Sequence, residues 1–384
     1  MNAIRKAGAS PLNIHDLARH LNISIGTVSR ALNGRADVSG ETRKRVLDAA
    51  KRLGYSPNQS GRSLRRGATG MVGFMVIANR ARALKGEAFF MTIFDGLQSV
   101  LAKHSLDLVI YYCGADQNPE TYVKRIVQRR LVDGLIISQT TRIDHRIDYL
   151  IRQDLPFIAF GRSRSGGEHS WLDLDFESVA AQSIDHLYRN GHRRIAVATT
   201  SDDVNFGQVY LEACRAELAS RDIRLTDELI IRGSMSEAGG YNIAERLLAL
   251  ENRPTAVVVV ENSMAIGLYS KLHEAGVPPG RDIAVVGFDR SLTNGLFLKP
   301  SLTQFSLSLV DLGCWLGEHL LELIEAKRKG SPIPFARKIW PLEMVVGGST
   351  MSLPASGDAD SLETSPPEQK SHFKLGARPT EASV

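Results

Sequence analysis

Three short segments near the start of the chain have the period of amphipathic helices. Apolar residues recur there every three or four positions, which places them on one face of a helix. Ser24 can cap the second segment and Asn33-Gly34 can end it, while the third runs from Ser39 to Gly54. The residues expected in the shared core are Ile14, Leu17, Ala18, Leu21, Ile25, Val28, Leu32, Val46, Leu47, Ala50 and Leu53. Short helices with a tight turn between the first two indicate a helix-turn-helix unit.

From Met71 onward, short apolar strands alternate with amphipathic helices. The predicted strands are 72–77, 108–112, 134–138, 157–160, 195–199, 256–260 and 283–288. The predicted helices include 90–103, 179–190, 237–250 and 264–274. Such alternation is typical of parallel sheets that helices cover on both faces. The pattern therefore predicts an all-α head followed by an α/β body.

Length and composition narrow the class of protein. With 384 residues, 43% of them hydrophobic, the chain can form two or three globular domains. It contains no stretch of about 18 uncharged apolar residues, so no membrane partner is expected. The basic stretch 1–11 lacks the apolar run of a secretory signal. Cys113, Cys214 and Cys314 lie far apart, as in a reducing compartment, so we expect a cytoplasmic protein.

Charge separates the head from the body. Residues 1–66 contain thirteen Lys or Arg and four Asp or Glu, a net charge of +9. Because the whole chain carries +5, the remaining residues sum to −4. A basic head on a mildly acidic body suggests that the head alone meets a polyanion, although a solvated basic face would give the same charge.

The exposed side of the second predicted helix carries Gly26, Thr27, Ser29 and Arg30. Short polar groups beside one long bidentate donor suit a reader of the DNA major groove. Arg30 could hold a guanine through its O6 and N7 atoms, while Thr27 and Ser29 would reach phosphates or bases. Periodicity alone fits a small helical bundle with a solvated face equally well.

The sequence shows no catalytic, metal or cofactor motif. There is no Gly-x-Gly-x-x-Gly after a strand, no phosphate-binding loop of the Walker type, and no Gly-x-Ser-x-Gly turn. The ten histidines have no metal-ligand spacing. His192, directly before a strand, is interpreted as part of a structural turn. We therefore expect no cofactor, no metal and no enzymatic activity.

Several runs of residues resemble the lac repressor (LacI/GalR) family of transcriptional regulators. In the head these are IHDLARHLNISIGTVSRALNG from Ile14, VSGETRKRV from Val38 and LGYSPN from Leu53. In the body the family markers are RRLVDGLI from Arg129, GHRRIA from Gly191, VVGFD from Val285 and PSLT from Pro300. The resemblance implies a dimeric regulator that binds a palindromic operator in double-stranded DNA. It also implies a body like periplasmic sugar-binding proteins, with two lobes, three crossovers and a ligand between them.

The resemblance also assigns roles in the head. Ile25 and Gly26 match positions that choose operator bases, and Thr27 and Ser29 match phosphate and base-edge contacts. Asn33 matches a contact to the DNA backbone, and Tyr55 and Asn58 match positions that touch the duplex where the chain leaves the head. Residues 58–68 resemble the family's hinge helix, which is too short to be stable alone. There Leu64 matches an apolar wedge in the minor groove, and the charge of Arg62 would neutralise a phosphate; a flexible basic linker is the alternative.

In the body, the resemblance indicates an effector site between the lobes. The matching positions are Phe89, Phe90, Arg162, Asn205, Tyr210, Glu261, Asn262 and Asp289. The aromatic pair would stack on a sugar ring, but it would also fit a purine, or could belong to the core. Tyr210 stands where the family has an arginine, and Leu307 stands near its glutamine, so the effector cannot be transferred. Phe160-Gly-Arg-Ser and Asn205-Phe-Gly resemble members that govern α-glucoside utilisation.

The domain prediction follows from these patterns. It comprises a head at 12–57, a hinge at 58–68, a two-lobed body at 70–350 and a disordered tail at 351–384, which is rich in Ser, Pro, Glu, Ala and Lys. One lobe is expected at 70–160 plus 290–325, the other at 161–290 plus 326–348. The tail lacks leucine heptads, so we expect a dimer, joined through the apolar helix at 89–101. A sugar-released repressor is the preferred function. A non-sugar corepressor, an α/β enzyme with a DNA-binding head, and a head that meets protein remain alternatives.

Overall fold

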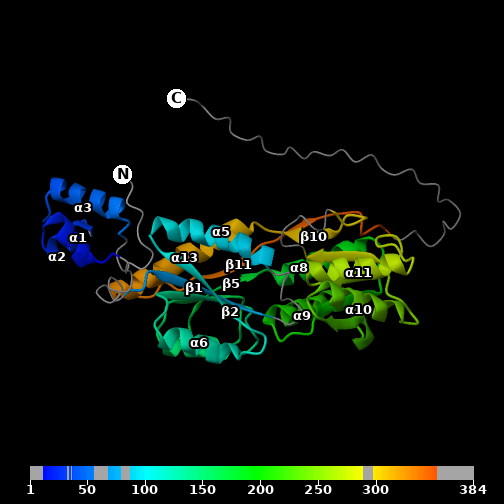
Figure 1. Ribbon diagram of the computed structural model, residues 1–384. Helices are drawn as coiled ribbons and strands as arrows, with labels where there is room; N and C mark the ends of the chain where they lie inside the picture. Colours follow the sequence, from blue (N-terminus) through cyan, green and yellow to red (C-terminus); the bar gives the residue numbers. More distant parts are fainter. Residues whose placement is uncertain are drawn as a thin grey trace, which may run out of the picture.

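The computed structural model describes residues 12–32, 34–35, 37–55, 68–78, 87–288 and 297–352, and the structural statements below concern these residues. The head comprises α1 (Ile14–Leu21), α2 (Ile25–Leu32) and α3 (Gly40–Leu53). It forms a separate bundle at one end of the molecule (Figure 1). Asn13 caps α1 in a reciprocal capping box with Asp16, and Ser39 caps α3. Gly54 ends α3 in the left-handed conformation, at φ 63°.

The core of the head confirms most of the predicted pattern and corrects two residues. Its buried side chains are Leu17, Ala18, Val28, Ala31, Val38, Val46, Ala49 and Ala50. Leu47 is 48% exposed and Ile25 is 41% exposed, so both were wrong as core residues. On α3 the buried face follows Val46, Ala49 and Ala50, and Leu47 lies about 100° around the helix from Val46.

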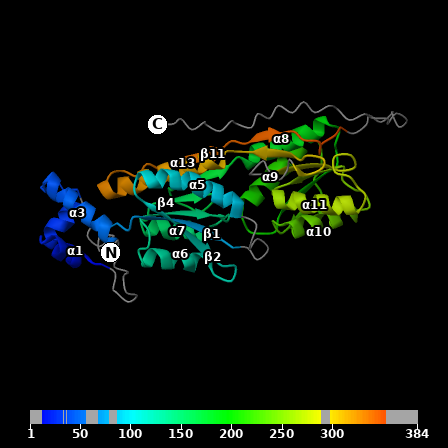
Figure 2. The same cartoon turned by 45° about the horizontal axis from the view of Figure 1, so that its top comes forward.

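The first lobe is built on a six-stranded sheet in the order β11-β5-β4-β3-β1-β2, with all neighbours parallel. The strands are β1 (Met71–Ile77), β2 (Asp107–Cys113), β3 (Gly134–Ser138), β4 (Phe157–Phe160), β5 (Ser170–Leu174) and β11 (Arg337–Trp340). Helices α5 (Glu87–Lys103) and α13 (Leu309–Lys329) lie side by side on one face of this sheet, and α6 (Pro119–Gln128) and α7 (His145–Arg152) lie on the other (Figure 2). Ile136 faces the first pair of helices, whereas its neighbours Leu135 and Ile137 face the second.

The second lobe repeats this architecture with the order β12-β10-β9-β8-β6-β7. Its strands are β6 (Ile195–Thr200), β7 (Ile230–Gly233), β8 (Ala256–Val259), β9 (Ala284–Phe288), β10 (Thr303–Ser306) and β12 (Glu343–Val345), of which only β12 is antiparallel to its neighbour. Its helices are α8 (Phe176–Arg189), α9 (Asn205–Ala219), η1 (Asp227–Leu229), α10 (Glu237–Leu248) and α11 (Asn262–Glu274). Two parallel-sheet lobes confirm the predicted fold class.

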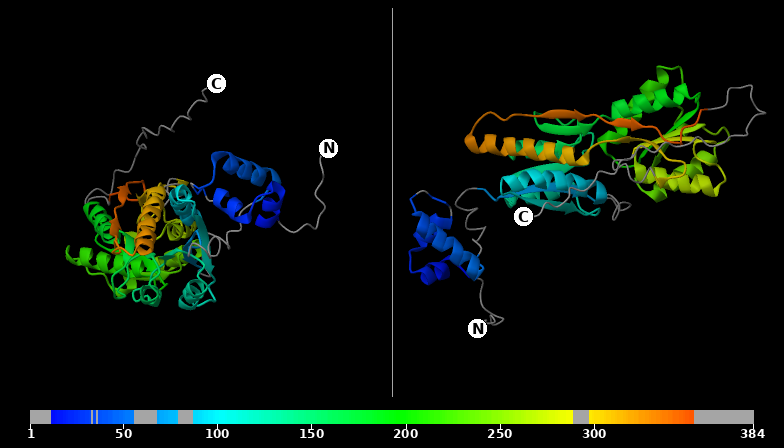
Figure 3. Two further views of the ribbon diagram at one scale, coloured as in Figure 1. Left: turned by 90° about the vertical axis from the view of Figure 1, so that its left-hand side faces the viewer. Right: turned by 90° about the horizontal axis from the view of Figure 1, so that it is seen from above.

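The chain passes between the lobes three times, as predicted, but at other residues. The passages lie between β5 and α8, between β10 and α13, and between β11 and β12. The first lobe therefore comprises about 71–174, 309–329 and 337–340, not 70–160 plus 290–325. Figure 3 shows the stretch from β11 to β12, in orange to red, running along both lobes. The short strands β5, β7, β10, β11 and β12 were missed because their sequences are polar or too short to show a period.

The helix pairs in both lobes depend on glycine at the point of contact. A Cβ on Gly96 of α5 would lie 2.1 Å from the Val310 carbonyl oxygen of α13. A Cβ on Gly267 of α11 would lie 1.7 Å from the Glu237 carbonyl oxygen of α10. Because α13 covers the apolar face of α5, the outer side of this helix, which includes the exposed Met91, is what stays open to a second copy, and the dimer interface expected at 89–101 remains a prediction. No helix in the described part of the chain is long and apolar enough to cross a membrane.

Candidate DNA-binding and effector sites

Helix α2 presents the polar residues that the sequence places on the DNA-reading face. The Ser24 hydroxyl accepts a hydrogen bond from the Thr27 backbone N–H at 3.0 Å and lies 2.9 Å from the Thr27 hydroxyl. This cap satisfies one of the free backbone donors at the start of the helix. Gly26 and Arg30 are exposed, whereas Thr27 and Ser29 are half-buried. The face has the composition expected of a groove reader, and its individual base contacts remain predictions.

Arg30 lies along its own helix. Its Nε donates to the Gly26 carbonyl oxygen at 3.2 Å, and its Nη1 donates to the Asp37 carboxylate at 3.4 Å. Both side chains of this ion pair are more than half exposed, and such pairs contribute at most about 1 kcal/mol. Arg30 can therefore exchange Asp37 for a base at small cost. A Cβ on Gly26 would lie 3.8 Å from Arg30 Nη2, an ordinary van der Waals contact, so position 26 lies directly beside the Arg30 guanidinium.

Of the other predicted DNA contacts, the structure describes Ile25 and Tyr55. Ile25 is exposed at the start of α2, which is compatible with a base contact and not with a core role. Tyr55 is half-buried against the core of the head. The remaining predicted contacts lie outside the described residues; they are Asn33, Asn58, Arg62 and Leu64.

At the boundary between the lobes, Asn205 joins the two sheets. Its backbone N–H donates to the Thr140 carbonyl oxygen at 2.8 Å, and its side-chain Nδ2 donates to the Arg162 carbonyl oxygen at 2.9 Å. Thr140 follows β3 and Arg162 follows β4, whereas Asn205 begins α9 of the other lobe. The carboxyl ends of parallel strands thus meet between the lobes, where open α/β sheets bind ligands.

The Arg162 guanidinium forms ion pairs with two carboxylates. Its Nε donates to Asp173 at 2.7 Å and its Nη2 donates to Glu177 at 2.8 and 2.9 Å. Burial disfavours the charged guanidinium, but the bonds to Glu177 and Asp173 outweigh it and raise the pKa of Arg162. We expected Arg162 to offer paired donors to a ligand; in this structure its Nε bonds Asp173 within the first lobe, and its Nη2 bonds Glu177 of the second lobe.

A cavity of about 310 Å³ adjoins this junction. Arg162 and Asn205 both line it, so the structure brings these two predicted effector residues together. Across the cavity, Arg142 Nη1 donates to Glu212 at 2.7 Å, which is a further link between the lobes. Sequence analysis missed Arg142 and Glu212 because they lie 70 positions apart and belong to no motif.

The predicted aromatic pair is divided between surface and core. Phe90 is 8% exposed and belongs to the core of the first lobe, against Phe74 and Phe94. Phe89 is half-buried and stacks on Phe160 at the end of β4, with ring centroids 6.2 Å apart. The partly exposed ring pair is therefore Phe89 and Phe160, not Phe89 and Phe90.

In the second lobe, Glu261 and Asn262 follow β8 and are both buried. Glu261 caps α11, and its carboxylate accepts the Ser263 backbone N–H at 2.7 Å. The side-chain oxygen of Asn262 is buried and accepts no hydrogen bond from any described residue. An unsatisfied buried acceptor costs about 1–3 kcal/mol, and a ligand hydroxyl is one donor that could satisfy it.

Tyr210 does not line the space between the lobes. It is 1% exposed within the second lobe, and burial together with the neighbouring Cys214 raises the pKa of its hydroxyl. Its face of α9 packs inward with Leu211 and Cys214. This burial argues against Tyr210 as an effector contact. Asp289 lies outside the described residues, and no group of three or more His, Cys, Asp or Glu in the described ranges could hold a metal ion.

Comparison with known proteins fits both parts of the chain. Residues 13–58 match the model of bacterial regulatory proteins of the lacI family, and residues 184–350 match a periplasmic binding protein-like domain. The transcriptional regulator AglR of Rhizobium meliloti is 29% identical over 350 residues, which are 90% of this chain and 96% of AglR. The transcriptional regulator RafR of Escherichia coli is 31% identical over 281 residues, which are 72% of this chain and 82% of RafR.

A solved structure shows the same fold along nearly the whole chain. The crystal structure of the lac repressor dimer, bound to its operator and an anti-inducer, superposes with a TM-score of 0.77 at 22% identity. The match covers 89% of this chain and all of the repressor chain. The head, the two lobes and the relatives agree. The chain belongs to the lacI family of bacterial regulatory proteins and is a DNA-binding transcription regulator.

Proposed function

We propose that the protein represses a sugar-utilisation operon and that a small carbohydrate between the lobes releases it from the operator. The proposal that a carbohydrate binds between the lobes rests on the buried side-chain oxygen of Asn262, which has no hydrogen-bond partner among the described residues. Carbohydrates offer many hydroxyl donors, and a buried polar group that pairs with a ligand hydroxyl gives strong discrimination. An α-glucoside is the sugar class that the sequence resemblance favours.

Other side chains at the carboxyl ends of the strands support this ligand class. The half-buried ring of Phe89, stacked on Phe160, offers an apolar platform beside the strand ends. Asn205 and Arg162 already join the lobes at the same edge. A ligand held between such groups would contact both lobes at once. It would therefore favour one relative orientation of the lobes over the other.

The proposed mechanism is a shift between two lobe orientations. In one orientation the two hinges of a dimer, proposed at 58–68, lie close enough to fold against the minor groove. The effector favours the other orientation and thereby weakens operator binding. It can do so only by the difference in its affinity for the two states. The ion pairs of Arg162 and Arg142 belong to the orientation seen here.

The proposed dimer places one head on each half of a palindromic operator. We assign its interface to the edge of the first sheet, with the outer side of α5 as the alternative. β2 is the outer strand of that sheet, and its Ile110 and Tyr112 side chains are 42% and 53% exposed. Apolar side chains on an open sheet edge are a surface that a second copy can cover.

The remaining proposals complete the functional assignment. We propose a head at 12–57 and a two-lobed effector and dimerisation body at 70–350, acting in the cytoplasm where the operator lies. We propose no enzymatic activity, because the polar groups between the lobes make hydrogen bonds and ion pairs but form no nucleophile–base pair in the described part of the chain. Residues 353–384 lie outside the described residues, and we predict them to be a disordered tail from composition alone.

Selection from a pool of randomised duplexes tests the proposal. Purified protein is incubated with the pool, and the retained DNA is sequenced. We expect an enriched palindrome of two half-sites, whose recovery falls when an α-glucoside is added. Recovery that rises with a non-sugar metabolite would favour a corepressor instead. No enrichment with any candidate sugar present would contradict the DNA-reading role.

A further inference from the structure

A second cavity, of about 560 Å³, lies at the amino-terminal edge of the first sheet. This edge is opposite the strand ends that face the other lobe. Val132 and Asp133 precede β3, Pro156 precedes β4, and Ala68 and Thr69 precede β1. The cavity is therefore separate from the proposed effector site.

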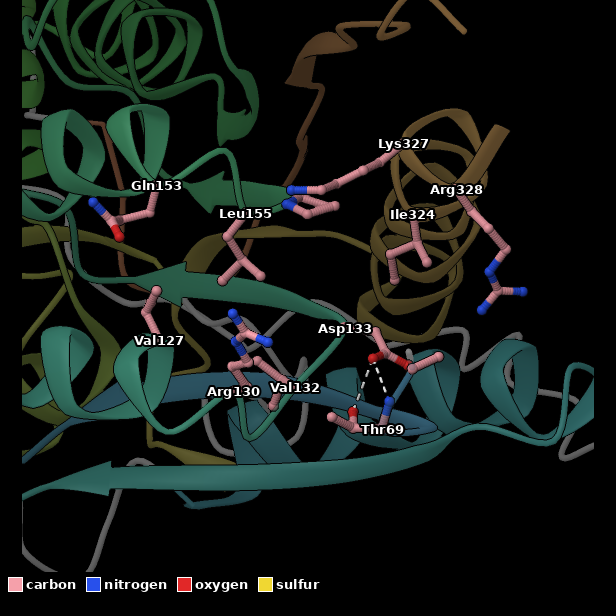
Figure 4. A pocket seen from close by; sticks show the side chains of 12 residues that line it. Thr69, Val127, Arg130, Val132, Asp133, Gln153, Leu155, Ile324, Lys327 and Arg328 are labelled. Atoms are coloured by element: carbon pink, nitrogen blue, oxygen red, sulfur yellow. Dashed lines mark hydrogen bonds between the residues drawn. The ribbon is translucent and has the colours of Figure 1, made fainter. Parts of the chain in front are cut away.

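Cationic side chains converge on this cavity. Arg130 follows α6, whereas Lys327 and Arg328 belong to the last turns of α13. Figure 4 shows Arg130 and Lys327 entering from opposite walls, with Arg328 beside Ile324 at the rim. Lys327 pairs with Asp154 at 3.0 Å. Among the described residues, no carboxylate lies within ion-pair distance of Arg130 or Arg328.

The one carboxylate in the cavity is already satisfied. Asp133 accepts hydrogen bonds from the Thr69 backbone N–H at 2.6 Å, the Thr69 hydroxyl at 3.0 Å and the Gly70 backbone N–H at 2.8 Å. Three cations and one anion leave a formal charge of +2 among the lining residues. Val127, Leu155 and Ile324 supply apolar walls.

We propose that this cavity binds a phosphate monoester, as carried by a phosphorylated small metabolite. Such a group carries a charge of about −1.5 to −2 at neutral pH, which complements the cavity. The planar guanidinium of Arg130 can donate two parallel hydrogen bonds to phosphate oxygens. Arg130 has a left-handed backbone, at φ 49°, so its side chain leaves the turn in a direction that an ordinary helical residue would not take.

The position of the cavity links it to DNA binding. Ala68 lines it, and Thr69 and Gly70 are fixed to Asp133 within it. These are the first described residues after the segment that leads from the head. A ligand in this cavity therefore contacts the point where the chain enters the body. Any effect of the ligand on operator affinity must be matched by an equal effect of operator on ligand affinity.

Thermal unfolding of the full-length protein, without DNA, tests the proposal. The probes are glycerol 3-phosphate and a hexose 6-phosphate, compared with the free hexose and with sulfate at equal ionic strength. We expect the phosphate monoesters to raise Tm in a saturable way. Arg130→Ala should weaken their binding about tenfold, the effect of losing one charge-assisted pair. Arg129→Ala removes an exposed neighbouring charge that does not line the cavity, and it should leave binding unchanged.

Four results would overturn the proposal. The first is that neither monoester raises Tm in a saturable way. In that case the cationic side chains would serve only to stabilise the negative carboxyl ends of α6 and α13. The second is an equal shift with sulfate, and the third is an equal loss in Arg129→Ala. If Arg130→Ala unfolds the protein, Arg328→Gln replaces it. Fourth, if Arg130→Ala weakens operator binding and the wild type binds no monoester, the phosphate that Arg130 contacts belongs to the DNA backbone and not to a metabolite.

Discussion

The head and the inter-lobe site hold their polar groups in opposite ways. In the head, Arg30 is exposed and paired with an exposed Asp37, so it can change partners with little loss of free energy. Between the lobes, Asn262 and Asp173 are buried, and each needs a partner of fixed geometry. Exposed groups suit a surface that must bind and release DNA, and their contribution depends on salt. Buried groups suit selection of one ligand and one lobe orientation, and salt affects them little.

The largest effect should follow removal of the arginine that joins the lobes. Arg162→Ala leaves the buried Asp173 carboxylate without its partner, and breaking such a pair costs about 3–5 kcal/mol. Chemical denaturation should show this loss of unfolding free energy. Glu177→Gln removes only the half-exposed partner, at 49% side-chain exposure, and should cost less than about 1 kcal/mol. Equal losses in both variants would show that burial does not set the energy of this cluster.

The next effect concerns ligand selection. Asn262→Ala removes the buried side-chain oxygen that has no partner among the described residues. It should weaken effector binding by about 1–3 kcal/mol, because the ligand hydroxyl would lose its hydrogen bond. Isothermal titration at two salt concentrations should give the same loss in both. Operator affinity without effector should stay unchanged, because Asn262 begins α11, and Figure 1 shows α11 at the end of the molecule away from the head. Unchanged effector affinity would remove Asn262 from the site.

In the head, Arg30→Ala should weaken operator binding by about 1–3 kcal/mol and relax the choice of base at one position. Unlike the previous effect, this loss should shrink at high salt. Asp37→Asn frees Arg30 from its ion pair and is the matched control. It should leave operator affinity unchanged or slightly higher. Lower operator affinity in Asp37→Asn would mean that the ion pair positions Arg30 for DNA binding.

The smallest effect is a dependence of stability on pH. Burial lowers the pKa of His186 and His192 in the second lobe, so each takes up its proton at a lower pH in the folded protein than in the unfolded chain. The unfolded chain binds these protons at its ordinary histidine pKa, about 6.5. Unfolding free energy should therefore be constant above that pH and fall below it. His192→Gln should flatten this slope in denaturation curves at pH 7.5 and 5.5, and an unchanged slope would contradict this origin of the pH dependence.

Sequence predicted the head better than the site between the lobes, for a physical reason. The head depends on local patterns: caps at Ser24 and Ser39, a turn at Gly34 and apolar spacing within single helices. The inter-lobe site depends on contacts between distant segments, such as Arg142 with Glu212 and Asn205 with Thr140. No pattern within one segment reports such contacts. Tyr210 illustrates the limit, since position in a family pattern did not reveal that its side chain is buried.

The lobe boundaries show the same limit. β10 and β11 are four residues each, with sequences TQFS and RKIW, and neither has the apolar run of a predicted strand. Their pairing with β9 and β5 assigns them to different lobes. Only the folded sheets supply that information, because each short strand is stabilised by its neighbours rather than by its own sequence.

Release of the operator by a sugar that binds at Asn262 can be measured in one titration. The operator recovered by selection is titrated with wild type and with Asn262→Ala, each with and without the recovered sugar, by fluorescence anisotropy. We expect the sugar to weaken operator binding by wild type and to have little effect on the variant, while both proteins bind the operator equally without sugar. Stronger operator binding in the presence of the sugar, or an equal response of the two proteins, would contradict this expectation.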